Sequence, residues 1–260
     1  MVTKRMVFHF YLTEDWDTNF ANRIHFKCLS HYTKLFDEVK IVIAVDDENR
    51  HLVNDVKKKF IDCIKSETLT FKVVKNDYYC EGGTFKTEIV DKLDRYDGLV
   101  FFGHNKGVTC MSTKGDFNED SLALWITAMY FYNLEFSDDV ERKLVVDRAR
   151  TIYGVFLMQA DWFNNVSHCF FSGTFYWLNP GRVKKWAKEL PEIYDREYAE
   201  WFPGEVFGEE ITYYLSSRCE YILCPEDLYR NARNAEYVIG KNDDDRARFK
   251  EFFKLITEND

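Results

Sequence analysis

The chain has 260 residues, of which 46% are hydrophobic and 17% aromatic, and its formal net charge at pH 7 is −9. This length suffices for one large domain with a substantial core. The acidic balance argues against a nucleic-acid partner, although a few placed Lys or Arg side chains could still form a phosphate pocket.

The cysteine pattern and the lengths of the apolar runs indicate the cellular compartment of the protein. The seven cysteines are scattered and include no Cys-x-x-Cys pair, a pattern atypical of a zinc site or a secreted disulfide framework. The first apolar run, residues 6–12, is too short for a signal peptide. No run approaches the ~20 residues that span a bilayer. We therefore expect a cytoplasmic protein that would meet any membrane-linked substrate by peripheral association.

Strands and helices alternate over the first hundred residues. Apolar runs predict strands, and apolar residues at helical spacing predict the helices between them. The strands are predicted at residues 7–12, 39–45, 69–74 and 98–102, and the helices at 20–35, 52–64 and 81–93. This alternation predicts an α/β fold with a mostly parallel central sheet flanked by helices.

Polar residues follow the ends of these predicted strands. In open α/β sheets, ligands bind beyond the carboxyl ends of the strands. We therefore expect a binding site formed by the side chains at these ends, which are Thr13, Asp46, Asn76, Asp77, His104 and Lys106.

The pattern changes after residue 110. A long helix is predicted around residues 122–130, strands at 152–158 and 169–178, and helices at 183–190, 191–202 and 209–217. Four apolar residues at helical spacing predict a docked terminal helix: Phe249, Phe252, Phe253 and Ile256. No linker or repeat interrupts the chain. We therefore predict one domain over 1–260, with a nucleotide-binding half (1–110), an acceptor-binding half (111–240) and a C-terminal helix (241–260).

The segment 103–107, Gly-His-Asn-Lys-Gly, follows the least polar predicted strand. Its glycines allow a tight turn and close approach to a ligand. Lys106 supplies a compact positive charge, and His104 can donate to an oxygen or ligate a metal. A sugar diphosphate leaving group needs its developing charge neutralised, which this segment could do. The alternative is a solvated turn.

An aromatic strand is interrupted by small residues at Ser172 and Gly173. Glycine inside a strand often marks the close approach of a ligand or another backbone. Alternation places Ser172, Thr174 and Tyr176 on one face, so we predict that these residues and Gly173 contact an acceptor. A two-sided core strand is the alternative.

Glu200 lies beside Trp201 and Phe202. An acceptor hydroxyl must lose a proton as it attacks, and a carboxylate near apolar walls can take that proton. Glu200 is therefore a candidate base, with Glu209 and Glu210 as weaker candidates and a solvated helix glutamate as the alternative. The chain lacks the dinucleotide-binding, P-loop, nucleophile-elbow and His-Glu-x-x-His motifs.

Two motifs carry a resemblance to a known family. The residues 102–107 and 171–177, together with Trp125 and the segment 199–201, resemble a group of glycosyltransferases from bacterial polysaccharide loci and large viruses. The resemblance covers roughly residues 5–215. It implies a glycosyltransferase-A-like fold, a nucleoside-diphosphate-sugar donor, a saccharide acceptor and a role in surface or capsular polysaccharide synthesis.

The resemblance also implies roles for the strand-end residues. Those that would contact the base and ribose of the donor are Tyr11, Thr13, Asp46 and Asn76. His104 and Lys106 would lie where the wider superfamily has a metal-binding Asp-x-Asp motif, and they and Gly107 would bind the donor. This departure leaves dependence on Mn²⁺ or Mg²⁺ open, because Lys106 could replace part of the charge of a metal or His104 could help to hold one.

Two other functions compete with sugar transfer. A nucleotidyltransferase that makes a nucleotide sugar usually has a basic Gly-rich loop after the first strand, whereas residues 13–17 here are acidic. A catalytically inactive carbohydrate-binding relative would keep the fold without turnover. The sugar, the nucleotide, the acceptor, the stereochemistry and the oligomeric state are not readable from the sequence.

Overall fold

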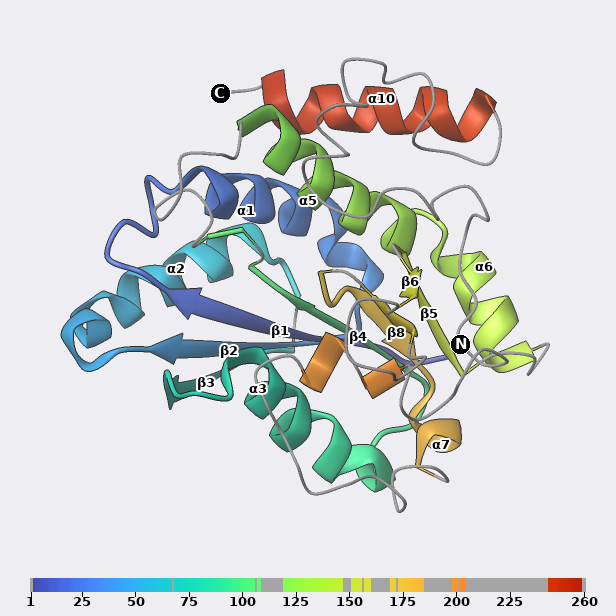
Figure 1. Cartoon of the computed structure of the whole chain (residues 1–260), viewed down its shortest axis with the longest axis horizontal. Coiled ribbons are helices and arrows are strands. Elements are labelled where there is room, and N and C mark those ends of the chain that lie inside the picture. The colour runs from blue at the N-terminus through green and yellow to red at the C-terminus, as the bar shows by residue number, and fades with distance from the viewer. Residues whose placement is uncertain are drawn as a thin grey trace.

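The computed structural model describes residues 2–66, 68–105, 107–108, 119–146, 151–155, 157–159, 169–171, 173–184, 198–200, 202–203 and 243–258. Within these residues the chain forms a layered α/β structure with helices on both faces of a central sheet (Figure 1). The predicted fold class, an α/β fold with a mostly parallel sheet flanked by helices, is confirmed.

The central sheet has six strands in the order β3-β2-β1-β4-β8-β5. Strands β1 to β4 are parallel, and β8 runs antiparallel to both β4 and β5. The six strands are β1 (Lys4–Leu12), β2 (Glu38–Val45), β3 (Leu69–Lys75), β4 (Leu99–His104), β8 (Tyr176–Leu178) and β5 (Ile152–Gly154). Since β1 to β4 are parallel, their carboxyl ends lie at one edge of the sheet.

Two predicted strands of the second half are each divided. Residues 152–158 form β5 and the start of β6 (Leu157–Gln159), and residues 169–178 form β7 (Cys169–Phe171) and β8. Strands β6 and β7 pair with each other in a separate two-stranded sheet. The prediction of one continuous strand over 169–178 is wrong because Gly173 and Thr174 have positive φ angles, which end the extended backbone.

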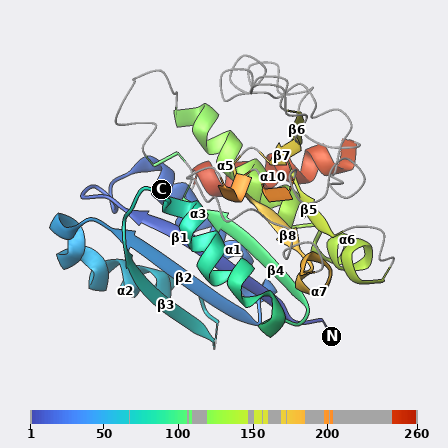
Figure 2. The ribbon, with the colours of Figure 1, turned by 60° about the horizontal axis from the view of Figure 1, so that its bottom comes forward.

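The helices lie in two layers. On one face are α1 (Phe20–Tyr32), α2 (Val53–Cys63), α5 (Glu119–Leu134) and α10 (Asp243–Glu258), and on the other are α3 (Cys80–Glu88), η3 (Val90–Arg95) and α7 (Pro180–Val183). Figures 1 and 2 show α1, α5 and α10 together on the face opposite α3. The remaining elements are η1 (Thr33–Leu35), η2 (Asp47–Leu52), α6 (Ser137–Glu141) and η4 (Arg142–Val146).

Alternating residues of the strands supply two hydrophobic cores. Phe8 and Phe101 face α1 and α5, whereas Val7 and Phe102 face α3. Successive side chains in a strand point to opposite faces, so strands covered on both sides must be apolar throughout. This requirement explains why β4 is buried over its entire length.

The C-terminal helix α10 packs on α1 and α5. Phe249, Phe252 and Ile256 are buried in the larger core. The Phe252 ring lies 5.3 Å from the Tyr32 ring, and the Phe249 ring lies 5.4 Å from the Phe131 ring, measured between centroids. Among the residues that the structure describes, no helix has both the length and the apolar character needed to cross a bilayer.

Candidate functional site

A hydrogen-bonded group of three residues lies at the carboxyl ends of β1, β2 and β3. The Tyr11 hydroxyl donates to Asp46 Oδ2 at 2.9 Å, and the Asn76 amide donates to Asp46 Oδ1 at 3.2 Å. All three side chains are partly exposed, so a ligand can reach them. We call Tyr11, Asp46 and Asn76 the edge triad. The structure thus brings together Asp46 and Asn76, predicted from their positions at strand ends, and Tyr11, which the resemblance implies.

The Tyr11 hydroxyl remains a hydrogen-bond donor at neutral pH. Partial burial and the hydrogen bond to Asp46 raise the pKa of Tyr11 to about 12. A neutral phenol beside an ionised carboxylate fixes the orientation of that carboxylate. The Tyr11 ring also presents an apolar surface, as a stacking platform for a planar group requires.

Asn105 joins the edge triad to the helix layer. Its amide oxygen accepts from the Tyr11 backbone N–H at 2.8 Å, and its amide nitrogen donates to the Tyr11 carbonyl at 2.9 Å and to Asn22 Oδ1 at 3.0 Å. The side chain is buried. Asn105 therefore continues the pairing of β1 with β4 beyond the last strand residue and holds Tyr11 in place. The sequence of the 103–107 segment by itself predicts no role for Asn105.

His104, the last residue of β4, is buried between two segments. Its Nε2 lies 3.0 Å from the Gly173 carbonyl oxygen, and its Nδ1 lies 3.9 Å from Glu81 Oε1. Because a carbonyl only accepts, we assign the proton to Nε2. The side chain of Glu81 is also buried. The sequence signal that could have identified Glu81 is its position in the Glu-Gly-Gly segment that opens α3.

Glu200 holds the turn that precedes β8. Its Oε1 accepts from Thr174 Oγ1 at 3.2 Å and from the Gly173 backbone N–H at 3.4 Å. This turn is conformationally unusual, since Thr174 has φ +57° and Gly173 has φ +96°. The predicted base and the predicted acceptor segment therefore meet, and His104 contacts the same turn. We call Gly173 and Thr174 the site turn.

Several predicted site residues lie in the protein interior. Thr174 and Tyr176 are fully buried, and the Tyr176 hydroxyl donates to the Ala199 carbonyl at 2.8 Å. Their side chains support the site turn and the segment around Glu200. Their predicted role as direct acceptor contacts is not tested, and neither is that of Ser172, which lies outside the described residues.

Of the other residues predicted to bind the donor, the structure describes Thr13 and Gly107. Thr13 is partly exposed as a residue, and its Oγ1 is buried with no hydrogen-bond partner among the described residues. Gly107 has φ +87°, and a Cβ there would lie 2.5 Å from Leu122 Cδ1, so glycine is required by the turn and by α5 packing. Lys106 lies outside the described residues.

The described residues do not form a site that fits a metal ion. No group of three His, Cys, Asp or Glu side chains in the described ranges has an arrangement that could hold one. At the position of the Asp-x-Asp motif, Asn105 uses its amide to hold Tyr11 and Asn22, and His104 Nε2 faces a carbonyl. We therefore derive no chemical step through a metal.

Comparisons with known proteins give similarity only at the level of structure. No protein-family model matches the sequence, and no curated protein matches it significantly. Similar solved structures include 4-diphosphocytidyl-2C-methyl-D-erythritol synthase from Anaerococcus prevotii (10% identity, TM-score 0.39, covering 90% of this chain and 99% of that chain). Another is residues 1–349 of S. aureus TarS (13% identity, TM-score 0.39, covering 98% of this chain and 70% of that chain).

A third similar structure comes from Desulfovibrio desulfuricans G20 and is provisionally described as a nucleotide-diphospho-sugar transferase (11% identity, TM-score 0.41, covering 99% of this chain and 98% of that chain). All three TM-scores are below 0.5. The fold class therefore rests on the strand order of the chain itself, and the function rests on the site.

Proposed function

We propose that this protein transfers a sugar from a nucleoside-diphosphate-sugar donor to a saccharide acceptor, in the assembly of a surface or capsular polysaccharide. The observation that carries the proposal is the edge triad, which places an aromatic ring, a carboxylate and an amide together at the carboxyl edge of a parallel sheet. This edge is where open α/β sheets bind their ligands.

The edge triad suits the nucleoside part of such a donor. The Tyr11 ring offers a stacking face for a base, and Asp46 offers carboxylate oxygens to a base N–H or a ribose hydroxyl. Asn76 already donates to Asp46, which keeps the carboxylate oriented before the ligand arrives. Thr13, next to the end of β1, is the further residue that we assign to this part of the donor.

The diphosphate is assigned to the segment that follows β4. Asn105 holds this segment against β1, because its backbone N–H donates to the His9 carbonyl at 3.1 Å and its side chain clamps Tyr11. Lys106 comes next in the chain, followed by Gly107, whose positive φ turns the backbone. We assign Lys106 as the positive charge that stabilises the leaving diphosphate.

The transfer step uses Glu200 and the site turn. The acceptor hydroxyl oxygen attacks the anomeric carbon of the donor, the bond from that carbon to the diphosphate oxygen breaks, and the nucleoside diphosphate leaves with the bonding electrons. Glu200 takes the proton of the acceptor hydroxyl. Its hydrogen bonds from Gly173 and Thr174 position the carboxylate, and His104 positions the same turn through the Gly173 carbonyl.

The test is to incubate the protein with a panel of nucleotide sugars and measure release of nucleoside diphosphate. Asp46→Asn should raise the KM for the donor at least about tenfold, because a hydrogen bond to a charged group contributes about 1.5–3 kcal/mol. Asp47→Asn is the matched control, since Asp47 is the exposed neighbour and pairs with Arg50. If both substitutions change the KM for the donor equally, the edge triad is not part of the donor site.

Glu200→Gln separates binding from chemistry. It should lower kcat about 10²- to 10⁴-fold while the Kd for nucleoside diphosphate stays near that of the wild type. Wild-type turnover in this variant would exclude Glu200 as the base. Nucleotide-sugar binding without turnover by the wild type would instead support the inactive carbohydrate-binding alternative, and release of pyrophosphate from a nucleoside triphosphate and a sugar phosphate would support a nucleotidyltransferase.

A further inference from the structure

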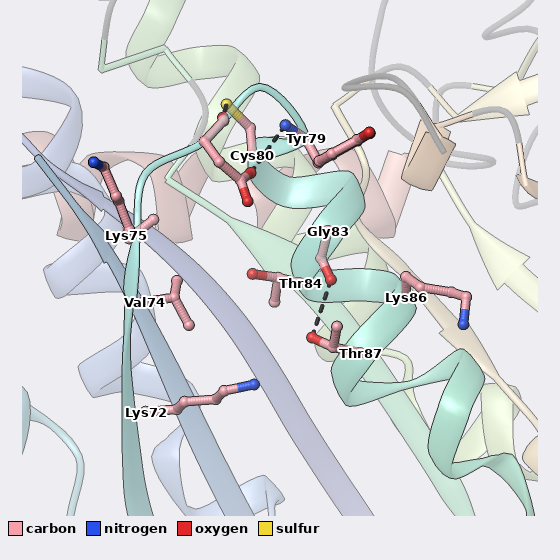
Figure 3. Close-up of a pocket in the computed structure, with 11 residues that line it drawn as sticks. Lys72, Val74, Lys75, Tyr79, Cys80, Gly83, Thr84, Lys86 and Thr87 are labelled. Carbon is pink, nitrogen blue, oxygen red and sulfur yellow. Dashed lines mark hydrogen bonds between the residues drawn. The ribbon is translucent and has the colours of Figure 1, made fainter. Parts of the chain in front are cut away.

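A pocket of about 310 Å³ lies between β3 and α3, on the sheet face opposite α1 and α5. Its floor is formed by Ala44 and Val74, and its wall by the α3 residues Gly83 and Thr84. Figure 3 shows Lys72 and Val74 pointing from β3 toward α3, with Thr84 and Thr87 on the opposite side. This volume is at the lower end of the range for small-molecule sites. We call it the α3 pocket.

Small and apolar side chains keep the α3 pocket open. Ala44 and Val74 are register partners on β2 and β3 and lie on the same face of the sheet. Across from them, Gly83 has no side chain, and Thr84 Oγ1 is held by His9 Nδ1 at 2.8 Å. The hollow is thus a consequence of residue sizes at fixed positions in two regular elements.

Positive charge dominates the lining of the α3 pocket. Among the described residues that line it are Lys72, Lys75 and Lys86, and the one carboxylate among them is Asp77. Lys75 and Lys86 have exposed carboxylate partners outside the pocket, Asp47 and Asp91. This local charge contrasts with the net charge of −9 for the whole chain.

A surplus of positive charge lies beside the pocket, around the Glu88 carboxylate that the lining residue Lys72 contacts. The buried carboxylate of Glu88 accepts Lys40 Nζ at 2.5 Å and Lys72 Nζ at 2.6 Å, and it also pairs with Lys92. Among the described residues, one carboxylate therefore faces three ammonium groups, which leaves a surplus of two positive charges in this group. Glu88 is only 1% exposed, so the three ammonium groups gather around a buried carboxylate.

We propose that the α3 pocket binds a small molecule that carries a phosphate monoester, with the phosphate beside Lys72. A phosphate monoester has a charge of about −1.5 to −2 at pH 7, which matches the surplus around Glu88. Lysine binds phosphate as a point charge. The rest of the ligand would lie along the pocket against Val74 and Thr84.

This site is separate from the donor site assigned above. The donor site uses the edge triad and the segment after β4, whereas the phosphate site uses the faces of β3 and α3. The two sites are close in space, since the thiol of Cys80, which lines the pocket, lies 3.7 Å from Asn76 Oδ1 of the edge triad. The experiment must therefore distinguish them.

The experiment is isothermal titration of the full chain with glycerol 2-phosphate at constant ionic strength, with glycerol as the uncharged comparison. The wild type should bind the phosphate and not glycerol. Lys72→Met should raise the Kd for glycerol 2-phosphate at least tenfold. In that variant Glu88 keeps Lys40 and Lys92 as partners, so its buried carboxylate is not left unpaired. Lys58→Met, on the exposed surface of α2, is the matched control and should bind as the wild type does.

A second variant keeps every lysine and closes the pocket. Thr87 is an exposed lining residue, so Thr87→Phe should place a ring over the opening and weaken binding without removing charge. Asp46→Asn and Lys106→Ala test the donor site and should leave glycerol 2-phosphate binding unchanged. The proposal is overturned if the wild type does not bind the phosphate, if Lys72→Met binds as well as Lys58→Met, or if binding is lost only in the donor-site variants.

Discussion

Asn105 shows how much one buried side chain contributes to this site. Its amide pairs with both backbone groups of Tyr11 and with Asn22, and so connects β1, α1 and the end of β4. An amide is required because the position needs an acceptor for one group and a donor for two others. Tyr11 in turn orients Asp46, so the geometry of the edge triad depends on Asn105.

The substitution Asn105→Asp keeps the shape of the side chain and removes the donor. A carboxylate oxygen would then face the Tyr11 carbonyl and Asn22 Oδ1. Leaving such groups unpaired costs about 1–3 kcal/mol each, so the free energy of unfolding measured in urea should fall by at least about 2 kcal/mol. Asn54→Asp, on the exposed surface of α2, should change it by less than about 0.5 kcal/mol. Equal stability of the two variants would contradict the role given to Asn105.

Glu88 should make stability depend on pH in the acid range. Burial by itself would raise the pKa of Glu88, but hydrogen bonds from Lys40, Lys72 and Lys92 lower it to about 2, below the ordinary value of 4.5. A group with a depressed folded-state pKa stabilises the protein above its unfolded pKa and loses that contribution as pH falls through the folded value. The free energy of unfolding should therefore decrease between about pH 4.5 and pH 2.

The matched measurement uses Glu88→Gln, which cannot ionise. Urea unfolding at several pH values should show a smaller decrease over this window for the variant than for the wild type. Asp55→Asn, on the exposed surface of α2, should leave the pH dependence as in the wild type. If the free energy of unfolding of Glu88→Gln falls with pH as steeply as that of the wild type, other carboxylates cause the acid sensitivity.

At the scale of elements, the site turn decides the shape of the second half of the site. Positive φ angles at Gly173 and Thr174 separate β7 from β8, so that β8 joins the central sheet and β7 pairs with β6. A non-glycine residue at positive φ is strained, and Thr174 keeps this conformation because Glu200 bonds its hydroxyl and its burial is complete. This strain lies beside the residue that we assign as the base.

Gly173→Ala should disturb this turn. Alanine is strained at φ +96°, and its Cβ would lie 2.4 Å from Met129 Sδ. The free energy of unfolding should fall by about 1–3 kcal/mol, and turnover should fall as well because Glu200 loses its fixed partner. In Gly181→Ala, the control, the new Cβ would lie 3.4 Å from Asn179 Oδ1 and φ is not positive, so stability should stay close to that of the wild type. A neutral Gly173→Ala would show that the turn accepts other conformations.

At the scale of the whole molecule, the site joins the two halves of the chain. The edge triad comes from β1 and from the residues after β2 and β3, whereas Glu200 and the site turn come from the second half. The two hydrophobic cores share the central strands, so both layers of helices fix the position of the same sheet edge. The division into a nucleotide-binding half and an acceptor-binding half remains a prediction.

Binding of a nucleoside diphosphate at this edge should therefore stabilise the folded chain. At a nucleoside diphosphate concentration of 100 times the Kd, the free energy of unfolding should rise by about 2.7 kcal/mol. A thermal-shift titration measures this effect. Asp46→Asn should need a higher ligand concentration for the same shift, while Asp47→Asn should follow the wild type. A shift that is the same in both variants would place the nucleotide away from the edge triad.

The sequence alone determined the fold class and most elements of the first half, because apolar periodicity is a local signal and parallel strands buried on both faces must be apolar throughout. It also placed Asp46 and Asn76 at one edge of the sheet, since the ends of parallel strands meet there whatever the details of packing, whereas Tyr11 came from the resemblance to glycosyltransferases. The roles of these residues in binding remain predictions. It did not reveal that residues 169–178 form two strands, because a positive φ is rare for threonine and Thr174 has contacts distant in the sequence, such as its hydrogen bond to Glu200, 26 residues later. Only the tertiary structure decided the clamp formed by Asn105, the contact of His104 with Gly173 near Glu81, and the three lysines around Glu88. Each of them joins segments that are distant in the sequence, and the energy of such contacts depends on distances and burial that exist only after the elements have packed.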